Sequence, residues 1–300
     1  MQTLLLTGAS GFLGKHIFQQ LQSIYKIDTL GRANTADYVV DLSAEIPFIG
    51  VRYDLVIHAA AKAHSLPTSE KDAADFFNVN EIGTQHLCEA FDRSGLYPEQ
   101  VVFISTVAVY GLETGEAIDE ETALNGKSPY AKSKINAELF LTEWCKRHSV
   151  KLTILRLPLI ASPNPPGNLG ALISAIKQGR YFNIGKGDAR KSMVRAEDVA
   201  ACMPVVAAIG GTYNLSDGYH PTFAELAAVI AKQCGKRSPK NIAYGLALLI
   251  AYAGSLLGGK SPFNMHKLHK ITASLTFDDR KARKAFGWNP KPVLDHFTIN

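Results

Sequence analysis

The sequence has few cysteines, and none of them is paired at a metal-binding or redox spacing. The 300 residues include four cysteines, which lie far apart: Cys88, Cys145, Cys202 and Cys234. Without a CxxC or CxxH pair a zinc site is not expected, and a disulfide framework is implausible in so long a chain. His266 and His269, in HKLH, are interpreted as residues of a helix surface rather than metal ligands. We therefore predict a cytoplasmic protein with reduced thiols and no metal.

Long apolar runs and leader segments are also missing. The N-terminal MQTLLLTGASG has no basic segment and only three consecutive leucines, so a signal peptide is not expected. Residues 242–257, IAYGLALLIAYAGSLL, carry no charge, but these sixteen residues fall short of the ~20 that span a bilayer. We predict a helix that is buried in the protein or docked on its surface, without firm membrane association. Contact with a membrane is the alternative.

Charge is neither strongly biased nor concentrated along the chain. There are 32 Lys and Arg against 27 Asp and Glu, a formal net charge of +5, and no basic run is dense enough for a nucleic-acid arm. We therefore expect no nucleic-acid partner. A hydrophobic content of 46% and a charged content of 20% are typical of a globular enzyme, and the length predicts one large domain or two fused units.

Strand and helix patterns alternate through the first half of the chain. Buried strands are predicted at residues 3–7, 26–30, 53–58, 100–105 and 151–157, and helices at 12–24, 79–91 and 128–148. Strands separated by long helices imply βαβ units and a parallel sheet with both faces covered. The turn-rich segment SPNPPGNLG, residues 162–170, ends this pattern, and helices follow at 171–178, from about 197, and at 222–234. We predict an α/β fold: a Rossmann-type doubly wound parallel sheet with a smaller, mixed C-terminal region.

A glycine-rich turn lies between the first predicted strand and the first predicted helix. Residues 7–14 read TGASGFLG. Glycines let the backbone approach a pyrophosphate, and the helix N-terminus adds free N–H groups and the positive end of a dipole. This context predicts a dinucleotide site, with contacts from Gly8, Ser10, Gly11, Phe12, Leu13 and Gly14. We therefore predict an NAD(P)-binding domain at residues 1–160 and a mainly substrate-binding domain at 161–300, with a return to the first domain around 193–216.

The order of further motifs resembles the extended short-chain dehydrogenase/reductase family, in its NAD-dependent epimerase/dehydratase branch. The glycine spacing is GxxGxxG, HAAA occupies residues 58–61, NVNEIGT contains Asn80, and YAKSK contains Tyr130 and Lys134. The resemblance covers nearly the whole chain. It implies an enzyme with a nicotinamide cofactor and a homodimer built on the helix at 128–148. It also extends the predicted cofactor site to Asp41, Leu42, Ala59, Ala60, Ala61, Asn80, Ser105, Leu157 and Pro158.

The end of the second predicted strand bears on which cofactor binds. NAD enzymes usually place an acid there, which accepts hydrogen bonds from the ribose, whereas this strand ends TLGR, with Arg32. A guanidinium suits the 2′-phosphate of NADP through charge-assisted bonds. We therefore favour NADP(H). The alternative is NAD(H), with Arg32 as a solvated surface residue; Asp28, earlier in the strand, is a weaker candidate for the ribose acid.

Tyr130 and Lys134 are the predicted catalytic pair. Because they are four residues apart on a helix, their side chains share one face. A neighbouring ammonium is expected to lower the pKa of a tyrosine, which can then take a proton from an alcohol or return one to a ketone. By resemblance, Lys134 also binds the nicotinamide ribose, Thr106 matches the family's catalytic Ser/Thr, which would donate to the substrate oxygen, and Ser105 lies near the nicotinamide.

The stretch STVAVYG, residues 105–111, narrows the reaction. Dehydratases that resemble this chain have Asp and Glu where it has Val107 and Ala108, and neither residue can transfer the proton that loss of water requires. The resemblance to nucleotide-sugar enzymes then leaves C4 epimerisation or reduction of a 4-keto-6-deoxy sugar, on a UDP- or dTDP-sugar. VYG is more typical of epimerases, whereas HAAAKAH, residues 58–64, and KLHKITASLTFD look like reductases.

Substrate contacts are predicted mainly in the second half of the chain. LRLPLIASPNPPGN resembles a family segment that ends in Gly-Asn, here with Asn168, although it departs from that segment at three positions. KSMVRAED looks like the segment whose leading Arg grips a diphosphate. That position is Lys191 here, and Arg190 just before it is the alternative, because Lys lacks the Arg fork. The predicted substrate-binding residues are Thr106, Val107, Asn168, Arg190 and Lys191.

Three other functions stay open. A reductase of another small carbonyl compound and a dehydrogenase of steroids or flavonoids would use the same Thr, Tyr and Lys. The C-terminal LTFDDRKARKAFGWNP, which resembles nucleotide-sugar enzymes, argues against the steroid or flavonoid dehydrogenase. A non-catalytic NAD(P)-sensing regulator usually lacks the Tyr–Lys pair, which this chain has.

Overall fold

A central parallel sheet organises the computed structural model, which describes residues 1–63, 67–256 and 263–299. Its strands lie in the order β11-β7-β5-β4-β1-β2-β3, and each neighbouring pair is parallel. The order reverses between β1 and β4, where open α/β sheets bind ligands at the carboxyl ends of their strands. The strands are β1 Gln2–Thr7, β2 Tyr25–Gly31, β3 Tyr38–Val39, β4 Leu55–His58, β5 Gln100–Thr106, β7 Lys151–Leu157 and β11 Gly211–Asn214.

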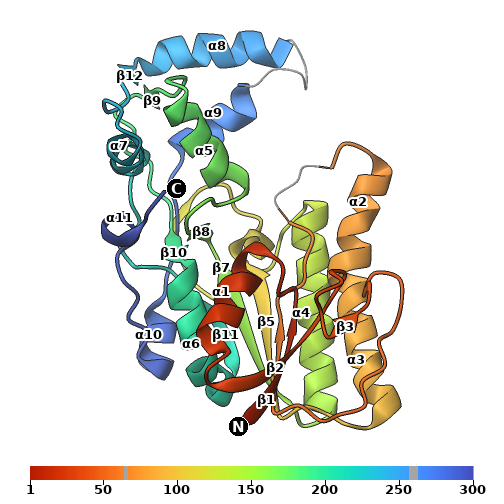
Figure 1. Ribbon diagram of the computed structural model, residues 1–300. Coiled ribbons are helices and arrows are strands. Elements are labelled where there is room, and N and C mark those ends of the chain that lie inside the picture. The colour runs from red at the N-terminus through yellow and green to blue at the C-terminus, as the bar shows by residue number, and fades with distance from the viewer. Residues whose placement is uncertain (64–66, 257–262, 300) are drawn as a thin grey trace.

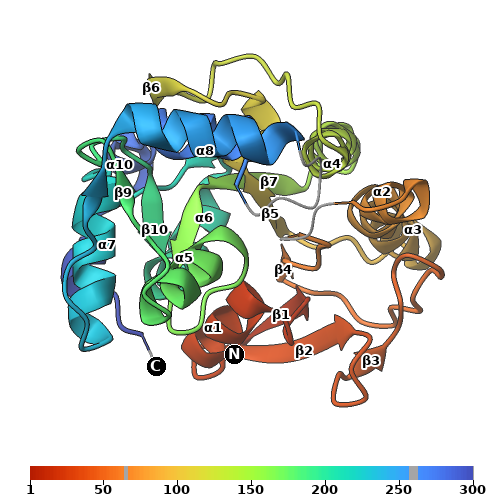
Figure 2. The same cartoon turned by 90° about the horizontal axis from the view of Figure 1, so that it is seen from above.

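Helices cover both faces of the sheet (Figures 1 and 2). On one face α1 (Phe12–Leu21) packs beside α6 (Ala196–Ile209). On the opposite face α3 (Gly83–Ser94) packs beside α4 (Pro129–Arg147). Leu4 and Leu6 of β1 belong to the core that includes α1 and α6, and Leu5 belongs to the core that includes α3 and α4. Burial on both faces explains why three consecutive residues of β1, Leu4–Leu6, are all apolar.

A smaller region lies beyond the carboxyl ends of the sheet strands (Figure 1). It contains three pairs of short parallel strands: β6 Gly115–Ile118 with β13 Leu275–Phe277, β8 Leu159–Ala161 with β10 Met193–Arg195, and β9 Asn183–Ile184 with β12 Asn241–Ile242. Its helices are α5 Gly167–Lys177, α7 Phe223–Gln233, α8 Tyr244–Leu256, α9 Met265–Thr272 and α11 Val293–His296. α10, Arg280–Phe286, instead packs against α6 and β11.

The predicted α/β fold with a Rossmann-type parallel sheet is confirmed, and the differences concern particular elements. The helix predicted at 79–91 begins with a π-helical turn, η1 (Asn78–Ile82), after an unpredicted helix, α2 (Glu70–Phe77). Ser69 caps α2 by accepting a hydrogen bond from the Asp72 N–H. The sheet takes its last strand, β11, from beyond residue 160. A division into two domains near that residue stays a prediction.

Candidate active site

The glycine loop packs tightly between β1 and α1. Gly8 has φ +73°, and a Cβ there would lie 2.6 Å from the Ala60 nitrogen; a Cβ on Gly14 would lie 2.0 Å from the Gly8 oxygen. α1 begins after Gly11, which has no side chain to cap it, and its first turn carries no acid. Leu13 is buried in the core below the loop. The first N–H groups of α1 are therefore available to an anion such as a pyrophosphate.

A hollow beside this loop lies where the adenosine of a dinucleotide is expected. Its volume is about 200 Å³, and its walls come from the glycine loop, the end of β2 and the following turn. The lining includes Ala9, Ser10, Gly31, Ala33 and Thr35. Backbone donors at a helix N-terminus next to a cavity at the end of β2 fit a dinucleotide.

Arg32 and Asp41 flank this hollow on the loop side of β2. The Arg32 guanidinium is largely exposed, and its Nη1 lies 4.0 Å from Asp41 Oδ2. Ser43 donates two hydrogen bonds to Asp41 Oδ1, at 3.0 Å from N and 2.7 Å from Oγ. These bonds hold the pKa of Asp41 below its ordinary value. Leu42, the next residue, is buried, and its carbonyl accepts from His86 Nδ1 at 2.8 Å.

Asp28 cannot act as the ribose acid, because it lies inside β2 and already has a partner. It pairs in register with Leu5 of β1, upstream of the end of the strand. Its Oδ2 accepts a hydrogen bond of 2.6 Å from the Tyr53 hydroxyl. The sequence already makes Asp28 the weaker candidate, because it lies earlier in the strand; the strand register and the Tyr53 hydrogen bond agree with that ranking.

The alanines after β4 are held against β1 by a buried polar chain. The Thr7 hydroxyl accepts from the Ala60 N–H at 3.1 Å and lies 2.7 Å from His58 Nδ1. His58 Nε2 lies 2.9 Å from the Thr84 hydroxyl, which donates to the Asn80 carbonyl. Burial lowers the pKa of His58 to about 3, so the ring is neutral. This chain fixes the loop of Ala59–Ala61 next to the glycine loop.

Asn80 joins that loop to the helix that carries the predicted catalytic pair. Its Oδ1 accepts from the Lys62 N–H at 2.8 Å, and its Nδ2 donates to the Lys62 carbonyl at 3.1 Å and to the Ser133 hydroxyl at 2.9 Å. Ser133 lies between Tyr130 and Lys134 on α4. The predicted cofactor residue Asn80 therefore positions α4 relative to β4.

Thr106 and Tyr130 meet at the carboxyl end of β5. Thr106 is the last residue of β5 and caps the 3-10 turn η2 (Val107–Tyr110) by accepting from the Ala108 N–H at 3.2 Å. Burial raises the pKa of Tyr130, and its interaction with the Thr106 hydroxyl opposes that rise. The expected lowering by Lys134 is not seen in this structure: desolvation of the phenolate dominates, and the pKa of Tyr130 lies above its ordinary value.

Lys134 lies one turn further along α4 and is almost completely buried. Its Nζ lies 4.1 Å from the centroid of the Phe103 ring. Burial lowers the pKa of Lys134 to about 7, although the charge of Glu138 opposes this shift. The predicted pair is thus brought together with Thr106 at the strand ends, and its lysine is poised to gain or lose a proton near neutral pH.

A buried polar network that the sequence analysis missed lies below this pair. Glu138 accepts hydrogen bonds from Ser105 Oγ and, at 2.8 Å, from Arg156 Nη2. Arg156 Nη1 donates to the Tyr110 hydroxyl at 3.1 Å, and Tyr110 donates to Asn214 Oδ1 at 2.7 Å. Ser105, predicted near the nicotinamide, thus directs its hydroxyl to α4. The signal for Glu138 is its spacing, four residues after Lys134 on the same face of the helix.

The predicted substrate residues differ in their exposure. Arg190 is exposed, and its Nη1 donates to the His220 carbonyl at 3.0 Å. Lys191 is half-buried, and burial together with the charge of Lys270 lowers its pKa to about 8. Asn168 is exposed in the first turn of α5. Two predicted cofactor residues, Leu157 and Pro158, lie at the end of β7, the first buried and the second half-buried.

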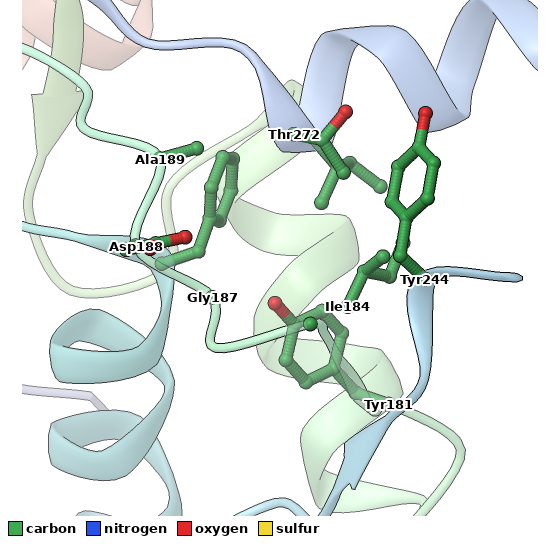
Figure 3. A pocket seen from close by; sticks show the side chains of 10 residues that line it. Tyr181, Ile184, Gly187, Asp188, Ala189, Tyr244 and Thr272 are labelled. Carbon is green, nitrogen blue, oxygen red and sulfur yellow. The ribbon is translucent and has the colours of Figure 1, made fainter.

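A second cavity, of about 320 Å³, lies in the smaller region (Figure 3). Tyr181, Asp188, Tyr244 and Thr272 surround it, from the segments before and after β9 and from α8 and α9. Among the described residues the buried Tyr181 hydroxyl has no hydrogen-bond partner, and burial raises its pKa to about 12. The Tyr181 hydroxyl could therefore form a hydrogen bond with a ligand in this cavity.

His266 and His269 are exposed on α9, and a carboxylate from a distant segment lies beside them. Their Nδ1 atoms each lie 3.6 Å from an oxygen of Glu113. Glu113 precedes β6, so this contact joins segments distant in the chain. Within residues 1–63, 67–256 and 263–299, no group of three His, Cys, Asp or Glu side chains could hold a metal ion.

Comparisons with known proteins agree with this geometry. The N-acetyl-alpha-D-glucosaminyl-diphospho-ditrans,octacis-undecaprenol 4-epimerase of Escherichia coli O157:H7 is 28% identical over 94% of this chain and 88% of its own. The GDP-6-deoxy-D-mannose reductase of Pseudomonas aeruginosa is 26% identical over 77% of this chain and 79% of its own. A solved UDP-glucose 4-epimerase of Thermus thermophilus, in complex with NAD, superimposes with a TM-score of 0.72 over 98% of both chains at 24% identity.

The family model that matches the sequence spans the strands of the central sheet, the glycine loop and helix α4. It describes the NAD dependent epimerase/dehydratase family and matches residues 4–216. The match spans both the glycine loop and the Tyr130–Lys134 pair, and the resemblance inferred from the motifs is confirmed. The chain belongs to the NAD dependent epimerase/dehydratase family.

Proposed function

We propose that the chain is an enzyme that moves a hydride between a nicotinamide cofactor and C4 of a sugar carried on a nucleoside diphosphate. The observation that carries this proposal is the cluster of Thr106, Tyr130 and Lys134 at the carboxyl end of β5, next to a loop that fits a dinucleotide. Two reactions share these groups: C4 epimerisation and reduction of a 4-keto-6-deoxy sugar. They differ in whether the cofactor leaves after one hydride transfer.

Each side chain of the cluster has a role in proton transfer. The bound nicotinamide supplies the site that gives or accepts hydride. Tyr130 takes the proton of the sugar hydroxyl, or returns it to the ketone, and Thr106 donates a hydrogen bond to the same oxygen. A protonated Lys134, one helical turn away, would favour the phenolate form of Tyr130 and so oppose the rise in pKa that burial causes.

Dehydration is disfavoured by the residues that follow Thr106. Elimination of water requires an acid for the leaving hydroxide and a base for the carbon acid. Val107 and Ala108 occupy η2, directly after the strand end, and neither ionises. The nearby Glu138 is held by Ser105 and Arg156, which leaves it unable to serve as that acid or base.

The cavity of Figure 3 is proposed to hold the group on the far side of the diphosphate. Asp188 in its lining lies three residues before Lys191, whose ammonium would bind the diphosphate as a point charge. The Tyr181 hydroxyl would donate or accept one hydrogen bond there. The Escherichia coli relative is named for a sugar whose diphosphate joins a polyprenol, so both nucleoside and polyprenyl diphosphate sugars belong in a test.

We propose NADP(H) as the preferred cofactor, on the evidence of the residues around the β2 end. Asp28 is engaged by Tyr53, and Asp37 accepts from the Thr29 N–H and hydroxyl at 2.8 Å. Each carboxylate therefore already has a partner on its Oδ2 within the protein. Arg32, exposed beside the hollow, can reach a 2′-phosphate once it leaves the 4.0 Å contact with Asp41.

Replacing Arg32 by alanine is expected to raise the Kd for NADP⁺ about tenfold, because a charge-assisted hydrogen bond is worth about 1.5 kcal/mol or more. The Kd for NAD⁺ should change little. Calorimetric titration of both cofactors measures this, and Arg52→Ala, an exposed arginine before β4, is the matched control. A wild-type preference for NAD⁺ would contradict the assignment.

Incubation with substrates decides between the two reactions. The purified chain is mixed with UDP-sugars, polyprenyl diphosphate sugars and 4-keto-6-deoxy UDP-sugars, with and without NADPH, and products are identified by mass spectrometry and NMR. Stoichiometric loss of NADPH with gain of two hydrogens indicates reduction; an isomer of unchanged mass indicates epimerisation. Both outcomes support hydride transfer at C4.

The control for this panel is the Tyr130→Phe variant, which should give no product. Release of water from a UDP-sugar would contradict the argument from Val107 and Ala108. Cofactor binding without turnover of any sugar would support the regulator instead. Turnover of other carbonyl compounds in place of sugars would support the general reductase. Assembly as a homodimer through α4 and a cytoplasmic location stay predictions.

A further inference from the structure

Helix α8 presents its large apolar side chains to solvent. Its buried residues are small: Ala247, Ala251 and Gly254. Its exposed residues are large: Tyr244, Leu246, Leu248, Leu249, Ile250, Tyr252 and Leu256, with exposed fractions from 37% to 74%. A helix on the surface of a globular protein normally shows the opposite arrangement. A continuous apolar patch of this kind marks a contact with another apolar phase.

The position of α8 leaves this face open. The helix lies at the periphery of the smaller region, on the side of the molecule toward which the carboxyl ends of the sheet strands point (Figures 1 and 2). Its contacts with the rest of the protein form a small cluster with Ile184 and Leu268, with Ile242 and Ile271 packed against it. A narrow stripe of small residues therefore packs α8 against this cluster, while the long side chains of the helix stay exposed.

The chain around α8 is basic and lacks acidic residues. Residues 226–277 contain seven Lys or Arg and no Asp or Glu, whereas the remaining residues carry 25 Lys or Arg and 27 Asp or Glu. The net positive charge of the whole protein therefore arises in this segment. Lys236, Arg237 and Lys240 are exposed just before α8, and Lys270 is exposed on α9. Two acids from other segments lie nearby: Glu113, against His266 and His269, and Asp188, in the wall of the cavity that Tyr244 and Thr272 line.

We propose that α8 and its basic flanks dock the protein on a bilayer that contains anionic lipids. An apolar helix flanked by lysines and arginines lies in the interface, with its apolar side chains among the acyl chains and its cations among the headgroups. Among the described residues no helix is long and apolar enough to cross a bilayer, so α8 lies along the surface. A second copy of the chain fits this face less well, because its own positive segment would repel the first.

Docking through α8 does not depend on the proposed reaction, and vesicles test it without any substrate. The full chain is sedimented with vesicles of phosphatidylcholine and with vesicles of equal parts phosphatidylcholine and phosphatidylglycerol. We expect binding to the anionic vesicles, weak binding to the neutral ones, and a loss of binding as salt rises. Absence of binding to the anionic vesicles would overturn the proposal.

Two pairs of variants separate the apolar and the basic contributions. Leu249→Gln with Leu256→Gln should raise the vesicle Kd tenfold or more, since two leucine side chains no longer leave water for the acyl chains. The matched control is Val205→Gln with Ile209→Gln, on exposed positions of α6. Lys236→Glu with Arg237→Glu should weaken binding to a similar extent, and the control is Lys146→Glu with Arg147→Glu at the end of α4.

The same variants distinguish a bilayer from a protein partner. Their thermal unfolding, followed by circular dichroism, should match that of the wild type, because the changed side chains are exposed. Equal vesicle binding by the Leu249/Leu256 variant and the wild type would overturn the role of α8. A second result would also overturn the proposal. In it, the wild type does not bind vesicles but forms a dimer in sedimentation velocity, and the leucine replacements abolish that dimer.

Discussion

Replacing Tyr130 by phenylalanine is expected to lower kcat by about a thousandfold or more, while the fold and cofactor binding stay intact. The change removes the hydroxyl that interacts with Thr106 and would exchange a proton with the sugar. The phenyl ring keeps its packing against Phe76, whose ring centroid lies 6.0 Å away. The Ser128 cap and the Pro129 start of α4 are also unchanged. Steady-state kinetics with the substrate found by the product analysis measures the effect.

A matched variant shows whether the loss is specific. Tyr97→Phe removes a hydroxyl from a half-buried tyrosine that stacks on His148, near the amino end of β5 and away from the cluster. It should keep near wild-type kcat. Cofactor binding by both variants, followed by fluorescence titration, should equal that of the wild type. Near-normal turnover by Tyr130→Phe would refute its assignment as the proton-transfer group.

Replacing Lys134 by methionine is expected to stabilise the protein at neutral pH and to lower kcat by about a hundredfold or more. Burial lowers the pKa of Lys134 from 10.5 to about 7, so the folded state binds its proton less tightly than the unfolded state does. The resulting penalty is complete below pH 7 and decreases as pH rises toward 10.5. Methionine has a similar volume and no charge to desolvate.

The polar network below Lys134 should allow the Lys134→Met variant to fold. Glu138 keeps Ser105 and Arg156 as partners when the lysine is removed, so no buried carboxylate is left without a partner. We expect the free energy of unfolding at pH 6 to 7 to rise by about 2 kcal/mol, and the gain to shrink as pH rises to 10. Urea unfolding at several pH values measures this. Lys132→Met, exposed on the same helix, is the control and should show no such pH-dependent gain. A destabilised Lys134→Met at every pH would contradict the burial argument.

Predictions that depend on residues close together in the sequence agree with the structure. The glycine loop is such a case, because its shape depends on the positive φ of Gly8 and on the contact of Gly14 with the Gly8 carbonyl. Tyr130 and Lys134 form another, since a helix places residues four apart on one face. The three consecutive leucines of β1 likewise indicate burial on both faces of a parallel sheet.

Partners far apart in the chain could not be predicted in the same way. Asn80 and Ser133 are separated by 53 residues, and Ser105 and Glu138 by 33. Asn80 and Ser105 are predicted at the cofactor, and their hydrogen bonds also hold α4 against the loop after β4 and against β5. Glu113 meets the α9 histidines only because β6 and β13 pair. Such contacts depend on how the segments pack.

The sequence by itself determined the α/β class, the place of the dinucleotide loop, the Tyr130–Lys134 pair and the lack of acids at Val107 and Ala108. These features are encoded in spacings within one loop or one helical turn. The tertiary structure decided the rest, because desolvation depends on all the segments around a group. Burial against Phe103 sets the pKa of Lys134. The packing of α8 through its small residues leaves its leucines on the surface, where the uncharged sequence also allowed a buried helix.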